Sequence, residues 1–141
     1  MRIYELVREQ QTYRADLNQT VFEVAQSMVA RGIGAVPVLE NGLLIGVFSE
    51  RDLMKRVVVE GLNPRNVRIS AVMTRDPLTV SPQEEIETCR ALMKRHGFRH
   101  LPVCEGTQLR GMVSLRDILL HDLDAKDEEV RMMRAYIQAG I

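Results

Sequence analysis

The sequence has no net charge, few cysteines and no long hydrophobic run, and each absence argues against a class of protein. Basic and acidic residues number 19 each, so the basic surface that bulk nucleic-acid binding needs is missing. No apolar run reaches the roughly 18 residues that span a bilayer. Two cysteines are too few for a disulfide framework, and the N-terminus lacks the apolar stretch of a secretory signal. We therefore expect a cytoplasmic protein that binds neither nucleic acid nor membrane.

Common catalytic and metal-binding signatures are also missing. The chain has no Walker loop, no Gly-x-Gly-x-x-Gly and no Gly-x-Ser-x-Gly. His96, His100 and Cys104 do not form a convincing zinc set, because Gly97 should break the helix and no Cys-x-x-Cys completes four ligands. We therefore expect neither an enzyme nor a metal protein.

An internal repeat dominates what is present. Residues 19–54 align without gaps with residues 84–119, at an offset of 65, and ten of the 36 pairs are identical. Each copy predicts a strand, a helix, two strands and a second helix. Because each copy alone would have a small core, we expect an α/β (α+β) fold with two repeats packed about a pseudo-twofold axis. The predicted units are residues 1–65, residues 66–122, and a tail over residues 123–141.

Local signals place the first repeat's elements. Thr20 is a candidate N-cap for a helix that Gly32 should end, since glycine adopts the left-handed conformation cheaply. Asn41-Gly42 predicts a hairpin between strands over 35–39 and 43–48. Ser49 should cap the helix that follows.

The tail differs in composition from the repeats. Five acidic residues lie between Asp122 and Glu129, and apolar residues follow at helical spacing from Val130 to Ile137. This pattern predicts a short acidic turn and then an amphipathic helix that ends near Gly140. The apolar stripe must pack on the repeats, on a second copy or on another protein.

The string shared by both repeats carries the functional candidates. It runs from Gly46 to Asp52 and from Gly111 to Asp117, at a strand end followed by a helix start. Free N–H groups at such a helix start attract anions. A serine and an arginine suit phosphate, and a carboxylate can accept hydrogen bonds from ribose hydroxyls. The same Ser-x-x-Asp spacing also describes an ordinary capping box, so a nucleotide site and a simple helix cap both remain open.

The sequence resembles a tandem pair of cystathionine-β-synthase (CBS) domains over roughly residues 1–122. The resemblance rests on Val36-Pro37-Val38, on Leu101-Pro102-Val103, and on the two Gly-x-x-Ser-x-x-Asp strings, all in register. It implies a non-catalytic regulatory module that binds an adenosine compound such as AMP, ADP or ATP in clefts between the repeats. S-adenosylmethionine or NAD, and degenerate clefts in a purely structural protein, are the alternatives.

The resemblance also implies a role for each site residue. Asp52 and Asp117 would bind ribose, and the phosphate contacts would be Ser49, Arg51, Ser114 and Arg116. Arg14 and Thr79, which open the two repeats, would lie near the base, with Arg99 and His100 in the wall of the second site. Since Thr79 fits the family pattern and Arg14 departs from it, we expect the second site to bind more tightly.

The resemblance further implies a face-to-face homodimer. Its expected interface consists of two apolar stripes, one in each repeat: Leu53, Met54 and Val57, and Ile118, Leu119 and Leu120. Such stripes carry more apolar surface than one core needs. An unidentified protein is the other expected partner.

Overall fold

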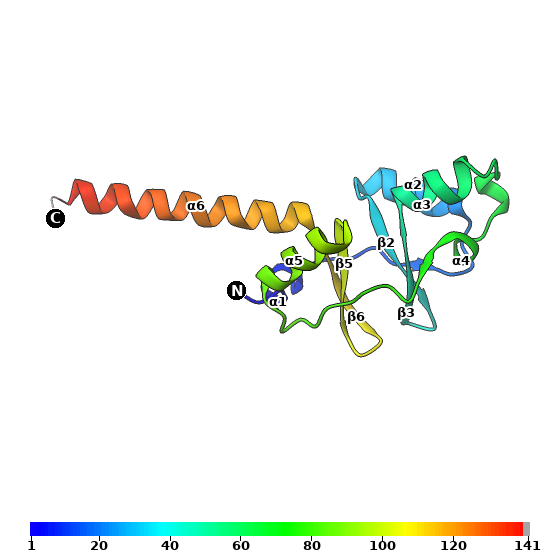
Figure 1. The fold of residues 1–141 in the computed structure, drawn as a ribbon, viewed down its shortest axis with the longest axis horizontal. Coiled ribbons are helices and arrows are strands. Elements are labelled where there is room, and N and C mark those ends of the chain that lie inside the picture. Colours follow the sequence, from blue (N-terminus) through cyan, green and yellow to red (C-terminus); the bar gives the residue numbers. More distant parts are fainter. Residues whose placement is uncertain (140–141) are drawn as a thin grey trace.

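The computed structural model describes residues 1–139 as two small α+β halves with a long helix projecting from one of them (Figure 1). The first half contains β1 (Ala15–Asp16), α2 (Val21–Arg31), β2 (Ala35–Glu40), β3 (Leu43–Ser49), α3 (Glu50–Leu53) and a π-helical turn (Met54–Val58). The second contains α5 (Ile86–His96), β5 (His100–Glu105), β6 (Gln108–Ser114) and α6 (Leu115–Gln138). Segments leading into the repeats add α1 (Tyr4–Val7), a 3₁₀ turn (Pro64–Asn66), α4 (Ile69–Val72) and β4 (Thr74–Arg75).

The predicted order of elements is confirmed, and so are the local signals behind it. The Thr20 side chain accepts a hydrogen bond from the backbone N–H of Glu23, and Gly32 ends α2 in the left-handed conformation at φ 64°. Asn41 and Gly42 both have positive φ, as the tight turn between β2 and β3 requires. The first strand of the second repeat is reduced to a single parallel bridge between Val80 and Val103.

The strand register brings corresponding residues of the two repeats to equivalent places. Ala35 pairs with Ser49 across β2 and β3, and His100 pairs with Ser114 across β5 and β6. Both hairpins are antiparallel, so the start of one strand lies beside the end of the next. In each half, the motif serine therefore lies beside the first residue of the preceding strand, at the same end of the hairpin.

Each half has its own hydrophobic core. Phe48 is fully buried in the first core, and Leu101 and Ile118 are buried in the second. A small third cluster contains Cys104. Both cysteines are buried, and burial raises the pKa of the Cys89 thiol to about 11. The cysteines therefore act as small apolar core residues, as predicted.

The segments that lead into the repeats are exchanged between the halves. Ile3 and Val7, from the segment before the first repeat, are buried in the core of the second half. Ile69 and Val72, from the connector, are buried in the core of the first half. The predicted first unit, residues 1–65, therefore begins with a segment that packs on the second half, because its apolar side chains complete that core.

The exchange explains one repeated glycine. A Cβ at Gly46 would lie 2.8 Å from the carbonyl oxygen of Thr74, and a Cβ at Gly111 would lie 2.8 Å from the Cβ of Val7. Real Cβ atoms do not approach other atoms so closely, so each lead-in segment runs against a strand position with no room for a side chain. The glycine of the Gly-x-x-Ser-x-x-Asp string therefore lies where the exchanged segment crosses.

The predicted acidic turn is wrong, because α6 runs without interruption from Leu115 to Gln138. No glycine or proline interrupts this stretch, and its acidic residues sit on a solvated helix where Glu128 pairs with Arg131 and Lys126 with Glu129. From Leu123 onward, every described residue of α6 is exposed. The predicted end near Gly140 lies outside the described residues.

Candidate functional site

Both repeated motifs form capping boxes. In the first, the Ser49 hydroxyl accepts a hydrogen bond from the backbone N–H of Asp52 at 3.2 Å, and the Asp52 carboxylate accepts one from the backbone N–H of Ser49 at 3.0 Å. In the second, the same two bonds join Ser114 and Asp117 at 3.0 and 2.9 Å. The interpretation of Ser-x-x-Asp as a helix-capping box is thus correct for both repeats. Ligand binding depends on what else each aspartate contacts.

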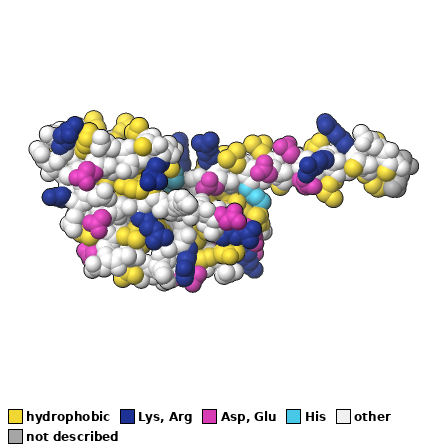
Figure 2. All heavy atoms as spheres, turned by 180° about the vertical axis from the view of Figure 1, so that it is seen from behind, with side chains coloured by type: hydrophobic (Ala, Val, Ile, Leu, Met, Phe, Trp, Pro, Cys, Tyr) yellow, Lys and Arg dark blue, Asp and Glu magenta, His cyan; other side chains and the backbone are white. Residues whose placement is uncertain are grey.

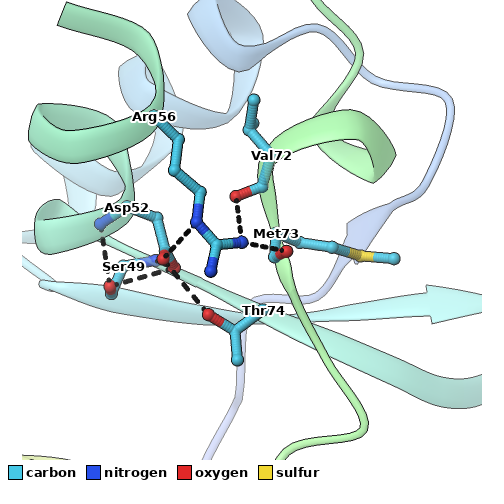
Figure 3. Close-up of polar contacts among 6 residues, drawn as sticks. All are labelled: Ser49, Asp52, Arg56, Val72, Met73 and Thr74. Carbon is cyan, nitrogen blue, oxygen red and sulfur yellow. Dashed lines mark hydrogen bonds and ion pairs between the residues drawn. The ribbon is translucent and has the colours of Figure 1, made fainter. Parts of the chain in front are cut away.

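Asp52 is almost fully engaged within the protein (Figure 3). Its second oxygen accepts a hydrogen bond from the Thr74 hydroxyl at 3.1 Å and lies 3.8 Å from Nε of Arg56. The same guanidinium donates to the carbonyl oxygens of Val72 and Met73, the latter at 2.7 Å. Asp52 is 7% exposed. This carboxylate therefore connects the helix start to the exchanged connector segment.

Asp117 is less constrained. One of its oxygens caps α6, and the other accepts no hydrogen bond from any residue in the part of the chain that the structure describes. The side chain is half-buried, and neighbouring Arg116 is exposed. A half-buried carboxylate oxygen next to the N-terminus of a long helix can accept a ligand's hydroxyl hydrogen bond.

The structure brings together some of the predicted residues of the second site. His100 lies beside Ser114 in the sheet register, and the backbone N–H of Leu115 donates to the carbonyl oxygen of Arg99 at 2.8 Å. Thr79 precedes the Val80 bridge and is exposed, as is the Arg99 side chain. The start of β5, the end of β6 and the start of α6 thus lie close together at one end of the hairpin.

The first site has the same backbone but different side chains. Ala35 takes the place of His100, and Arg14 and Arg51 are exposed. The Glu50 carboxylate lies over Gly34, within 3.3 to 3.4 Å of where a Cβ would stand. A negative group therefore lies near this helix start, which disfavours phosphate there.

Glu50 also acts on the second repeat, a role that no sequence pattern indicates. Burial lowers the pKa of His100, while the charges of Asp117 and Glu50 partly offset the shift and Arg99 adds to it. A carboxylate of the first half therefore lies near enough to His100 of the second half to affect its pKa. Glu50 aligns with Leu115, so the repeat gave no signal for it.

The His100 environment predicts a pH dependence of stability. Because the folded-state pKa of His100 is lowered, the unfolded chain takes up its proton more readily, and stability should fall as the pH drops below about 6.5. The His100→Gln variant should lose less stability than the wild type between about pH 7.5 and pH 5.5. Urea unfolding at both values measures the difference. Equal losses in the two proteins would contradict the prediction, since His96 and His121 are common to both.

Two hollows elsewhere on the surface contain no predicted site residue. One hollow on α2 is lined by residues that include Phe22 and Val29, and another on α6 by residues that include Asp124 and Arg131. Within residues 1–139, no group of three or more His, Cys, Asp or Glu side chains could hold a metal ion. None of the described helices combines the length and apolar character needed to cross a membrane.

Comparison with known proteins identifies the family. The CBS domain model matches residues 13–59 and 69–124. The mitochondrial CBS domain-containing protein CBSX3 of Arabidopsis thaliana is 30% identical over 128 residues, which are 87% of this chain and 62% of that protein. The CBS domain-containing protein YhcV of Bacillus subtilis is 32% identical over 106 residues, 75% of each chain. The chain thus spans less than two thirds of the Arabidopsis relative.

Solved structures agree with this match. A CBS-domain protein from Agrobacterium tumefaciens has a TM-score of 0.79 at 26% identity, over 86% of this chain and 99% of that one. A CBS-domain protein from Pyrobaculum aerophilum, solved in complex with AMP, has a TM-score of 0.76 at 25% identity, over 86% and 97%. The repeat, the two capping-box motifs and the matched domains agree: this chain belongs to the CBS-domain family, with two repeats in tandem.

Proposed function

We propose that this chain is a regulatory module that binds an adenosine nucleotide, AMP, ADP or ATP, at the second repeat's motif and performs no catalysis. The observation that carries the proposal is the uncommitted oxygen of Asp117 next to the start of α6. The Pyrobaculum relative, complexed with AMP, supports the choice of ligand.

The proposed contacts follow the chemistry of each group. Asp117 accepts hydrogen bonds from the ribose hydroxyls, and Ser114 with Arg116 contacts the phosphate at the helix start. Thr79 and His100 lie toward the base, with Arg99 at the exposed rim. The first motif supplies a weaker site, with Ser49, Arg51, Asp52 and Arg14 in the corresponding roles, because Asp52 is already bonded to Thr74.

A thermal-shift series with AMP, ADP, ATP, adenosine, S-adenosylmethionine and NAD tests the proposal. A ligand present at 100 times its Kd should stabilise the fold by about 2.7 kcal/mol. No shift with any compound would favour degenerate clefts in a structural protein. A shift with S-adenosylmethionine or NAD alone would change the ligand, and turnover of a bound compound would contradict a non-catalytic role.

The same proposal includes a homodimer. The proposed location of the protein is the cytoplasm. The expected interface is narrower than the two predicted stripes, since Val57 and Ile118 are buried in the cores. Met54 is 65% exposed, and Leu119 and Leu120 are about half exposed. These three side chains are the apolar surface that a second module would cover.

A further inference from the structure

The projecting part of α6 is not covered by any other part of residues 1–139. From Leu123 to the last described residue, all side chains are exposed. This part of α6 projects away from the two halves (Figures 1 and 2). An isolated helix of this length is marginal in water, because its stability in proteins comes mostly from packing an apolar face. The helix therefore needs a partner surface to be stable.

An apolar stripe with heptad spacing runs along this projecting part. Its members are exposed and are separated by four, seven, three and four residues: Leu119, Leu123, Val130, Met133 and Ile137. Lys126 occupies the one remaining core position. At about 100° per residue, the stripe lies roughly a quarter turn from buried Ile118, so it is distinct from the face that packs on the module. Alternating spacings of three and four are the pattern of a two-stranded coiled coil.

We propose that α6 pairs in parallel with α6 of a second copy of this chain, through this heptad stripe. Charges beside the stripe favour a second copy in this orientation. In a parallel pair, Glu129 faces Arg134 of the second copy, and Lys126 lies next to Asp127 of the second copy. An antiparallel pair with the stripe in contact would instead place Asp127 against Asp127 and Glu129 against Glu129.

A parallel pair makes two like-charge contacts: Asp122 with Asp127 of the second copy, and Lys126 with Lys126 at the core position, where Asp127 lies beside the two lysines. The first of these contacts is already relieved. Asp122 would face Asp127 of the second copy, but Arg90 of α5 binds the Asp122 carboxylate at 2.9 Å. Lys126 at this core position lowers the affinity of the pair. The pairing thus joins two modules at the same end and is independent of nucleotide binding.

Two adjacent methionines provide a matched test. Met132 and Met133 are each 65% exposed, but only Met133 belongs to the stripe. Sedimentation equilibrium of the full chain should show Met133→Lys raising the dimer dissociation constant by about tenfold or more, with Met132→Lys close to wild type. Equal constants for the two variants, or a monomeric wild type at tens of micromolar, would overturn the pairing.

Orientation is tested by cross-linking and by charge exchange. Under mild oxidation, Val130→Cys should form a disulfide-linked dimer, because equivalent core positions meet only in a parallel pair. Cys89 and Cys104 are buried and should not compete. Glu129→Arg should weaken the dimer, and adding Arg134→Glu should restore it.

Absence of the Val130→Cys cross-link would overturn the pairing and leave the stripe to another protein or to an antiparallel arrangement. The thermal shift with AMP should be the same in Met133→Lys and wild type. Loss of pairing with the shift intact therefore separates this inference from the proposed nucleotide site.

Discussion

Replacing Asp117 with alanine is expected to weaken binding of an adenosine nucleotide roughly ten- to hundredfold, which corresponds to about 1.5 to 3 kcal/mol. The reason is the loss of a carboxylate oxygen that the protein does not use itself. The folded state should lose only the cap, about 1 kcal/mol. Asp117→Ala should therefore damage binding more than stability.

Asp52→Ala should show the opposite balance. Its carboxylate holds the helix cap, the Thr74 hydroxyl and part of the Arg56 guanidinium, and it is nearly buried (Figure 3). Removing it leaves the backbone N–H of Ser49 and the Thr74 hydroxyl without this acceptor and takes away the carboxylate beside Arg56, so the free energy of unfolding should fall by about 2 to 3 kcal/mol. Nucleotide affinity should change less than in Asp117→Ala.

Isothermal titration and urea unfolding of the two variants measure both quantities. Asp52→Asn and Asp117→Asn serve as isosteric controls that keep an oxygen for the cap but remove the charge. A larger affinity loss from Asp52→Ala would reverse the ranking of the sites. Negligible losses from both would reduce the motifs to helix caps.

The exchanged lead-in segment should carry an equally large effect on stability. Ile3 is fully buried in the core of the second half, although it lies about a hundred residues before that half's strands β5 and β6. Ile3→Ala should lower the free energy of unfolding by about 2 to 5 kcal/mol, through lost burial and the cavity left behind. Neighbouring Tyr4 is 46% exposed, and Tyr4→Ala should cost far less.

Ile69 provides the matched variant, since it occupies the corresponding place in the first core and is also fully buried. Chemical denaturation gives the size of each loss, and native-state hydrogen exchange gives its location. Ile3→Ala should accelerate exchange in β5 and β6, and Ile69→Ala in β2 and β3. A negligible effect of Ile3→Ala, or faster exchange confined to the first half, would contradict the exchange of segments.

Local patterns were sufficient for much of the fold. Caps, hairpin turns and helical stripes depend on neighbouring residues, so Thr20, Gly32 and Asn41-Gly42 predicted their elements correctly. The repeat predicted two equivalent halves. Whether Asp117 and its neighbours bind a nucleotide remains a prediction, because a capping box looks the same with and without a ligand.

The features that escaped prediction depend on contacts distant in sequence. The gapless alignment begins at residue 19, so it said nothing of where α1 would pack. The Thr74 hydroxyl meets Asp52 only because β4 crosses beside β3. The acidic cluster after Asp122 suggested a turn, but charged residues without glycine or proline are compatible with a solvated helix, and α6 continues through them.

The order in which the chain is synthesised makes the exchange of lead-in segments matter for folding. Ile3 and Val7 leave the ribosome before the strands of either half, yet the core that they complete includes Val113 and Ile118, which are made about a hundred residues later. The first half has all its parts once β4 has emerged. The apolar side chains of Ile3 and Val7 thus stay uncovered while nearly the whole module is made, and the second half closes only when this early segment meets β6 and the start of α6.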